Sequence, residues 1–86
     1  MKFVNIGFNN MINSDRVIAV ISADSAPSKR LIQEARDNGR VIDCTSGKKT
    51  RCIIVMDSDH IILSAIQNET VSVRLNGVDD QTEAEA

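Results

Sequence analysis

The distribution of apolar residues along the chain predicts five strands. Runs rich in Ile and Val are separated by turn-forming residues, such as Asn9-Asn10 and Asn13-Ser14-Asp15. The strands are expected over residues 3–6, 16–22, 40–45, 51–56 and 60–66. The last three follow one another closely, so we expect a three-stranded meander in which residues 47–51 form the tip of a hairpin.

Two helices are predicted from residues that are typical of helix ends. Ser25 is a suitable N-cap, Pro27 suits the first turn because its missing N–H is not needed there, and Gly39 suits the position after the last turn. A main helix is therefore expected over residues 26–38, and a short C-terminal helix over residues 68–75. The predicted fold class is α+β: a small, strand-rich antiparallel sheet with one main helix and one short helix.

Three of the expected strands contain apolar runs without alternating polar residues. These runs cover residues 17–21, 52–56 and 61–63. A strand with one face in water alternates apolar and polar residues, so we expect these three to be buried on both faces. Two helices of the expected lengths cannot cover both faces of a five-stranded sheet. The remaining apolar face predicts self-association into a homo-oligomer.

The length and composition of the chain indicate one small domain. Its 86 residues suffice for a single core, which we expect to lie within residues 1–78. Residues 79–86 include four acidic residues and little to bury, so we expect a disordered acidic tail. No apolar stretch approaches the ~20 residues that span a bilayer, and no secretory signal is present. We therefore expect a cytoplasmic protein without a membrane partner.

Charge is distributed unevenly along the chain. The net charge is −2, yet residues 29–51 hold seven Lys and Arg against three Asp and Glu, a net charge of +4. Residues 47–51, which we call the basic tip, carry Lys48, Lys49 and Arg51 and no acid. A Gly-led basic turn has little to pack against and suits contact with an anionic partner such as a nucleic-acid backbone. A solvated surface turn is the alternative interpretation.

Three further basic residues are candidates for the same surface. Arg16 stands at the start of the first long strand, and Lys29 and Arg30 lie in the first turns of the main helix, where the helix dipole disfavours cations. That placement suggests an external role, although exposed charge at helix starts is common. The basic tip lacks aromatic residues, which argues against stacking on single-stranded bases. Duplex DNA, held through its phosphates with some groove contact, is the expected partner.

The segment Asp57-Ser58-Asp59-His60 is an alternative centre of chemistry. Two carboxylates and an imidazole can bind a divalent ion. Successive strand residues point to opposite faces, however, and the sequence has a single His. We therefore favour a β-turn in which Asp57 and Asp59 accept hydrogen bonds from local backbone N–H groups, and we expect no metal and no cofactor.

Cys44 and Cys52 are a second alternative. Either thiol beside His60 would make a nucleophile, but Cys52 starts an apolar run and is expected to pack as a small hydrophobic residue. If the basic tip is a hairpin centred on Lys48, the two cysteines lie opposite each other on adjacent strands and can pair under oxidation. In the cytoplasm we expect reduced thiols. We expect no enzymatic activity and no small-molecule substrate.

Four segments follow a recognisable family pattern. They are Asn5-Ile6-Gly7-Phe8, Arg16-Val17-Ile18-Ala19, Ser25-Ala26-Pro27 with Lys29-Arg30, and Val55-Met56-Asp57-Ser58-Asp59-His60-Ile61-Ile62-Leu63-Ser64-Ala65. Together they resemble the RemA family of bacterial extracellular-matrix regulators, over about residues 3–75. The Met-Asp-Ser-Asp-His block is the specific part of the match.

The resemblance implies a DNA-binding transcriptional regulator that activates biofilm-matrix and osmoprotection genes. It also implies a fold similar to the LytTR DNA-binding domain, and ring-shaped homo-oligomers. The DNA contacts of the family lie at the hairpin, which carries over to Lys48, Lys49 and Arg51. The early arginine of the family corresponds to Arg16, and its helix-start proline corresponds to Pro27. For each of these two residues the resemblance leaves two roles open, assembly and DNA contact.

Lysine at positions 48 and 49 departs from the family, whose members typically carry arginines there. Lysine is a point charge without the planar fork that reads guanine, so we expect phosphate contact to persist and base selectivity to be lower or different. Two other functions remain alternatives. One is a structural or protein-binding ring with an acidic protein partner, and the other is a metal- or thiol-dependent enzyme built on the Cys, Asp and His residues above.

Overall fold

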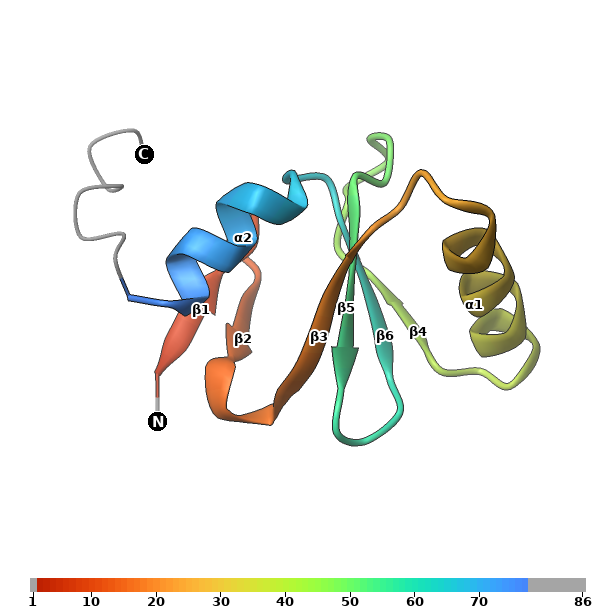
Figure 1. Cartoon of the computed structure of the whole chain (residues 1–86), viewed down its shortest axis with the longest axis horizontal. Helices are drawn as coiled ribbons and strands as arrows, with labels where there is room; N and C mark the ends of the chain where they lie inside the picture. The colour runs from red at the N-terminus through yellow and green to blue at the C-terminus, as the bar shows by residue number, and fades with distance from the viewer. Residues whose placement is uncertain (1, 78–86) are drawn as a thin grey trace.

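Two sheets and two helices form the part of the chain that the computed structural model describes, residues 2–77. A hairpin of β1 (Phe3–Asn5) and β2 (Met11–Asn13) leads through a 3-10 turn (Ser14–Arg16) into the larger sheet. The strands of the larger sheet are β3 (Val17–Ser22), β4 (Val41–Asp43), β5 (Cys52–Met56) and β6 (Ile61–Ser64). The helices are α1 (Ala26–Asp37) and α2 (Asn68–Leu75) (Figure 1). The predicted α+β class, with one main and one short helix, is confirmed.

The structure bears only in part on two further predictions, the acidic tail and the absence of a membrane partner. The predicted acidic tail, residues 79–86, lies outside the described residues. Within the described part, no helix combines the length and the apolar character that crossing a membrane requires.

The strands of the larger sheet are ordered β3–β5–β6–β4. β4 runs parallel to β6, with Val41 opposite Ile61, while the other neighbouring strands are antiparallel. The predicted antiparallel meander with a hairpin at the basic tip is therefore wrong, because β6 lies between β4 and β5. A strand of only three residues suits a sheet edge, and the longer apolar β5 and β6 take the central places. Residues 44–51 form a crossover loop at one end of the sheet.

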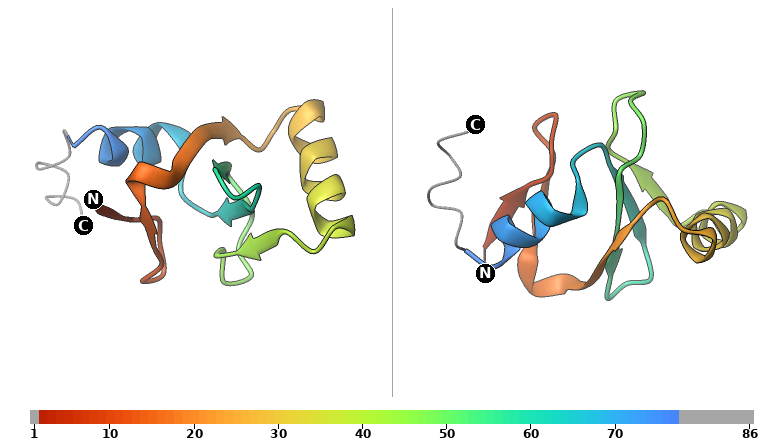
Figure 2. Two further views of the ribbon diagram at one scale, coloured as in Figure 1. Left: turned by 90° about the horizontal axis from the view of Figure 1, so that it is seen from below. Right: turned by 45° about the horizontal axis from the view of Figure 1, so that its top comes forward.

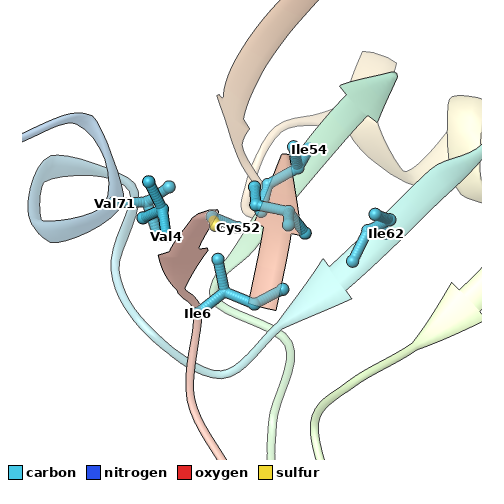
Figure 3. Close-up of a cluster of buried hydrophobic side chains, with 7 residues drawn as sticks. Val4, Ile6, Cys52, Ile54, Ile62 and Val71 are labelled. Atoms are coloured by element: carbon cyan, nitrogen blue, oxygen red, sulfur yellow. The ribbon is translucent and has the colours of Figure 1, made fainter. Parts of the chain in front are cut away.

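The chain itself covers both faces of the central strands. On one face, Ile53 and Leu63 pack with Ala35 of α1. On the other face, the β1–β2 hairpin and α2 complete the cluster in Figure 3, which consists of Val4, Ile6, Ile12, Cys52, Ile54, Ile62 and Val71. β5 and β6 are therefore buried on both faces, as predicted. The expectation of an uncovered apolar face is wrong. β2 forms where the sequence predicts only turns, and its Ile12 packs against the second face of the sheet.

The outer strands of the larger sheet expose apolar side chains. β3 is an edge strand of mostly half-buried residues, and a bulge between Val17 and Ala19 leaves Ile18 64% exposed. The prediction that β3 is buried on both faces is therefore wrong. At the opposite edge, Ile42 of β4 is 45% exposed.

The limits of both helices agree with the prediction. The Ser25 hydroxyl accepts a hydrogen bond from the Ser28 N–H at 3.2 Å, and Pro27 lies in the first turn of α1. After α1, Gly39 has a φ of +69°, which glycine adopts without strain. α2 begins at Asn68 without a side-chain capping bond.

Candidate nucleic-acid interface

A tight turn opens the crossover loop between β4 and β5. The Lys48 N–H donates to Thr45 O at 2.9 Å, and the two residues between them, Ser46 and Gly47, have φ values of 52° and 82°. Positive φ at both central positions is the conformation of a type I′ turn. The Asp43 carboxylate accepts bonds from the Thr45 hydroxyl at 2.6 Å and N–H at 2.9 Å, which hold the pKa of Asp43 below its ordinary value. The start of the loop is thus fixed.

Three cations follow this turn on the surface. Lys48, Lys49 and Arg51 are all exposed, and none forms an ion pair with another of residues 2–77. The Arg51 N–H donates to Ser64 O at 2.8 Å, which ties the end of the loop to β6. The positive charge of the loop is therefore held at one end of the sheet and is open to an anionic partner.

A cleft of about 450 Å³ lies against these cations. Three connections that are distant in sequence line it: the β1–β2 turn, the β4–β5 loop and the link from β6 to α2. Figure 2 shows the first two projecting side by side from the same side of the molecule. The lining residues are Gly7, Phe8, Lys48, Lys49, Arg51, Ala65 and Ile66. Three of them are cations and none is acidic, so the cleft suits an anionic ligand.

Phe8 is a candidate functional residue that the sequence reasoning missed. This residue is 51% exposed and lines the cleft, although the sequence predicts no aromatic residue beside the basic tip. The available signal was a large aromatic residue between Gly7 and Asn9, because exposed turns favour small and polar residues. The lack of aromatic residues within the basic tip itself is therefore not an argument against contact with bases.

Arg16 lies at the opposite end of the sheet from the cleft. β3 and β5 run antiparallel, and Val17, next to Arg16, stands opposite Met56 at the end of β5. Arg51 precedes the start of β5, so roughly the length of that strand, about 17 Å, separates the two arginines. Arg16 Nε donates to both carboxylate oxygens of Asp57 at 2.7 and 3.0 Å, which raises the pKa of Arg16. Arg16 does not reach the cleft of its own chain.

The first turns of α1 do not line the cleft either. Pro27, Lys29 and Arg30 are exposed, and α1 packs on the sheet face opposite the β1–β2 hairpin. None of the three is among the cleft residues. Their role in DNA contact or assembly stays a prediction.

Residues 57–60 connect β5 to β6 in a tight turn, as predicted. Their carboxylates pair with arginines instead of with local backbone N–H groups. Asp57 accepts from Arg16, and Asp59 Oδ2 lies 3.8 Å from Arg40 Nη1. Within residues 2–77, no three His, Cys, Asp or Glu side chains come together to form a metal-binding group.

Cys44 and Cys52 do not lie on adjacent strands. Cys52 stands opposite Ser64 of β6, and the Cys44 N–H donates to Leu63 O from the other side of β6. Two strand spacings, roughly 10 Å, separate the cysteines, which exceeds the ~7 Å that a disulfide tolerates. The condition for pairing under oxidation, a position opposite each other on adjacent strands, is therefore not met. Burial raises the pKa of Cys52 to about 11, and burial with the Asp43 charge raises that of Cys44, so both thiols are protonated at neutral pH.

Comparison with known proteins places the chain in a family. The family model for RemA-like proteins, described as extracellular matrix regulatory protein A-like, matches residues 3–75. The match confirms the resemblance.

Three relatives are similar over nearly their whole length. A protein of Geobacillus kaustophilus (strain HTA426) is 55% identical over 83 residues, which cover 96% of this chain and 95% of that protein. A protein of Carboxydothermus hydrogenoformans shows the same identity and coverage. One of Alkaliphilus metalliredigens is 56% identical over 86 residues, which cover 100% of this chain and 92% of that protein. The names of all three describe candidate regulatory proteins. The chain therefore belongs to the RemA-like family of regulatory proteins.

Proposed function

We propose that this chain is a transcriptional regulator that binds duplex DNA through the basic tip. The observation that carries the proposal is the cleft at the end of the larger sheet, which Lys48, Lys49 and Arg51 line and to which no acidic side chain of residues 2–77 contributes. The regulatory part rests on the family, whose description refers to regulation of the extracellular matrix. We extend it to the expression of matrix and biofilm genes, and to a fold similar to the LytTR DNA-binding domain.

The chemistry of the cations suits phosphate groups. Lysine is a compact charge with three N–H donors, which donate hydrogen bonds to phosphate oxygens in several directions. A plot of the logarithm of affinity against the logarithm of salt concentration falls with a slope of about −0.9 for each neutralised phosphate. Three such contacts give a roughly 40-fold loss of affinity between 50 and 200 mM salt for each bound chain.

We further propose that the chain acts as a homo-oligomer, with a ring as the simplest closed assembly. Three cations per chain give modest affinity, and an assembly that repeats the basic tip adds its contacts. Within the described residues, β3 and β4 have no strand partner on their outer sides, and each exposes an Ile side chain. Contact between the β3 edge of one copy and the β4 edge of the next is heterologous and closes into a ring when its rotation permits. These edges are the surfaces that we assign to assembly.

We assign the chain no enzymatic activity. We also propose that it acts in the cytoplasm, where it binds DNA. The two thiols are held protonated, and the carboxylates of residues 57–60 pair with arginines. Neither set is prepared for nucleophilic attack.

Binding to a labelled duplex of roughly 30 base pairs, followed by fluorescence anisotropy as salt is raised, tests the proposal. We expect binding at low salt that weakens steeply as salt increases. Absence of binding at low salt contradicts the proposal and favours an acidic protein as the partner of the cleft.

A further inference from the structure

Phe8 lies at the tip of the β1–β2 hairpin in a backbone conformation that bulky residues rarely adopt. Phe8 and Asn9 have φ values of 54° and 65°, and the Asn10 N–H donates to Gly7 O at 3.0 Å. Positive φ at both central residues defines a type I′ turn, which favours Asn and Gly at these positions. A phenylalanine there is strained, because its Cβ crowds the following carbonyl group.

The turn that carries Phe8 is nevertheless firmly held. Asn5 Oδ1 accepts from the Gly7 N–H at 2.7 Å, and Asn10 Nδ2 donates to Gly7 O at 3.1 Å. A Cβ added to Gly7 would lie 3.1 Å from Ile66 Cδ1, so the turn rests directly on the link between β6 and α2. Phe8 is thus presented on a fixed support.

Packing among residues 2–77 does not account for the Phe8 side chain. Phe8 is 51% exposed and belongs to neither cluster of core residues. It lines the cleft together with Lys48, Lys49 and Arg51. Strain that is retained at an exposed position beside a cleft is typical of functional sites.

We propose that Phe8 makes an apolar contact inside a DNA groove, next to the phosphates that Lys48 and Lys49 bind. This contact rests on the proposed function. Sugar faces and base edges provide apolar surface between the phosphates, and phenylalanine is among the side chains that proteins insert into grooves. A small anion would engage the cations alone and leave the ring in water. The mixed apolar and basic lining therefore favours a nucleic acid over a small anion, and duplex DNA is the form that the proposed function names.

The Phe8→Asn variant removes the ring without damaging the turn. Asn is favoured at this position of a type I′ turn, so we expect the midpoint of thermal unfolding to rise. We expect the affinity for a duplex to fall roughly tenfold at fixed salt. The salt slope should stay unchanged, because no phosphate contact is lost. The Phe8→Tyr variant keeps the ring and should retain the affinity.

Phe3, the other phenylalanine of the chain, provides a matched control. It is 54% exposed at the start of β1 and does not line the cleft, so Phe3→Asn should retain the affinity for the duplex. If the wild-type protein does not bind the duplex, the proposed function fails, and this contact with it. If the wild-type protein binds and Phe8→Asn binds equally well, only the contact is overturned. If Phe8→Asn lowers the affinity and also gives a smaller particle in light scattering, the contact is overturned as well, because the phenyl ring of Phe8 then acts in assembly.

Discussion

Arg16 Nε lies 2.7 Å from Asp57 Oδ2 and joins the start of β3 to the turn between β5 and β6. The side chains of Arg16 and Asp57 are 59% and 44% exposed, so solvent screens their attraction. The pair holds Arg16 at the end of the sheet that is away from the cleft. Within one chain, Arg16 and the basic tip therefore cannot share a phosphate.

Replacement of Arg16 by Ala should leave the midpoint of thermal unfolding nearly unchanged, because exposed ion pairs contribute little to stability. It should also lower the affinity for a duplex less than Lys48→Ala does. Calorimetry and anisotropy measure the two effects. A larger loss than that of Lys48→Ala, in a variant with unchanged particle size, would contradict this expectation and place Arg16 on DNA in the assembled protein.

Gly47 and Gly39 form a matched pair for testing the shape of the basic tip. Their φ values are +82° and +69°, and a Cβ added to either meets no atom within 4 Å. Alanine at either position is therefore strained by the backbone alone, at a cost of about 1 kcal/mol. We expect similar losses of stability in Gly47→Ala and Gly39→Ala.

Only Gly47→Ala should lower the affinity for a duplex, because Gly47 lies in the turn that presents Lys48. A several-fold loss is expected, with Gly39→Ala close to the wild-type protein. Equal affinities in the two variants would show that the turn conformation does not position the cations.

Local signals in the sequence were sufficient for α1, β5 and β6. Ser25 caps α1 through the Ser28 N–H, as its residue type predicts. Uninterrupted apolar runs correctly predict that β5 and β6 are buried on both faces, since no polar residue in them needs water.

Features that depend on distant contacts were not predictable in the same way. Met11–Asn13 forms β2 because it pairs with β1 and buries Ile12, while its flanking Asn and Ser residues predict turns. The parallel pairing of β4 with β6 is equally non-local, and the sequence favours the nearer β5 as a partner. Phe8 and Lys48 line one cleft only because three separate connections pack together, so the cations of the candidate site were predictable and its aromatic residue was not.

The exposed edges of the larger sheet give a separate test of assembly. Ile18→Lys and Ile42→Lys each add a charge to an edge strand, at residues that are 64% and 45% exposed. We expect both variants to keep the fold and to form smaller particles in light scattering, because charged edges oppose pairing between chains. Val73→Lys, on α2 at 38% exposure, is the control and should assemble like the wild-type protein. A wild-type protein that is monomeric at micromolar concentration rules out the oligomer.

The thiol of Cys52 makes stability depend on alkaline pH. Burial raises its folded-state pKa from 9.0 to about 11, so the folded chain binds this proton more tightly than the unfolded chain. The resulting stabilisation is fully present below pH 9.0 and is lost as pH rises to about 11. Chemical denaturation at several pH values measures this loss of stability. The Cys52→Ala variant should lack the part of the pH dependence that the thiol causes. A pH dependence that is identical in the two proteins would show that the thiol is not the cause.

The location of the DNA contact can be separated from the effect of net charge. Lys48→Glu with Lys49→Glu reverses two charges in the cleft, and Lys29→Glu with Arg30→Glu reverses two charges on α1 outside it. The second pair serves as a fold-preserving control, because acidic residues are favoured in the first turns of a helix.

The most direct test is the affinity of these two double variants for one duplex at low salt, with particle size measured in parallel. We expect Lys48→Glu with Lys49→Glu to lose binding, by at least about a hundredfold, while its assembly is unchanged. Lys29→Glu with Arg30→Glu should bind within a few-fold of the wild-type protein. Unchanged affinity in the first variant would contradict the assignment of the basic tip as the DNA contact, and an equal loss in both variants would extend the contact surface to the start of α1.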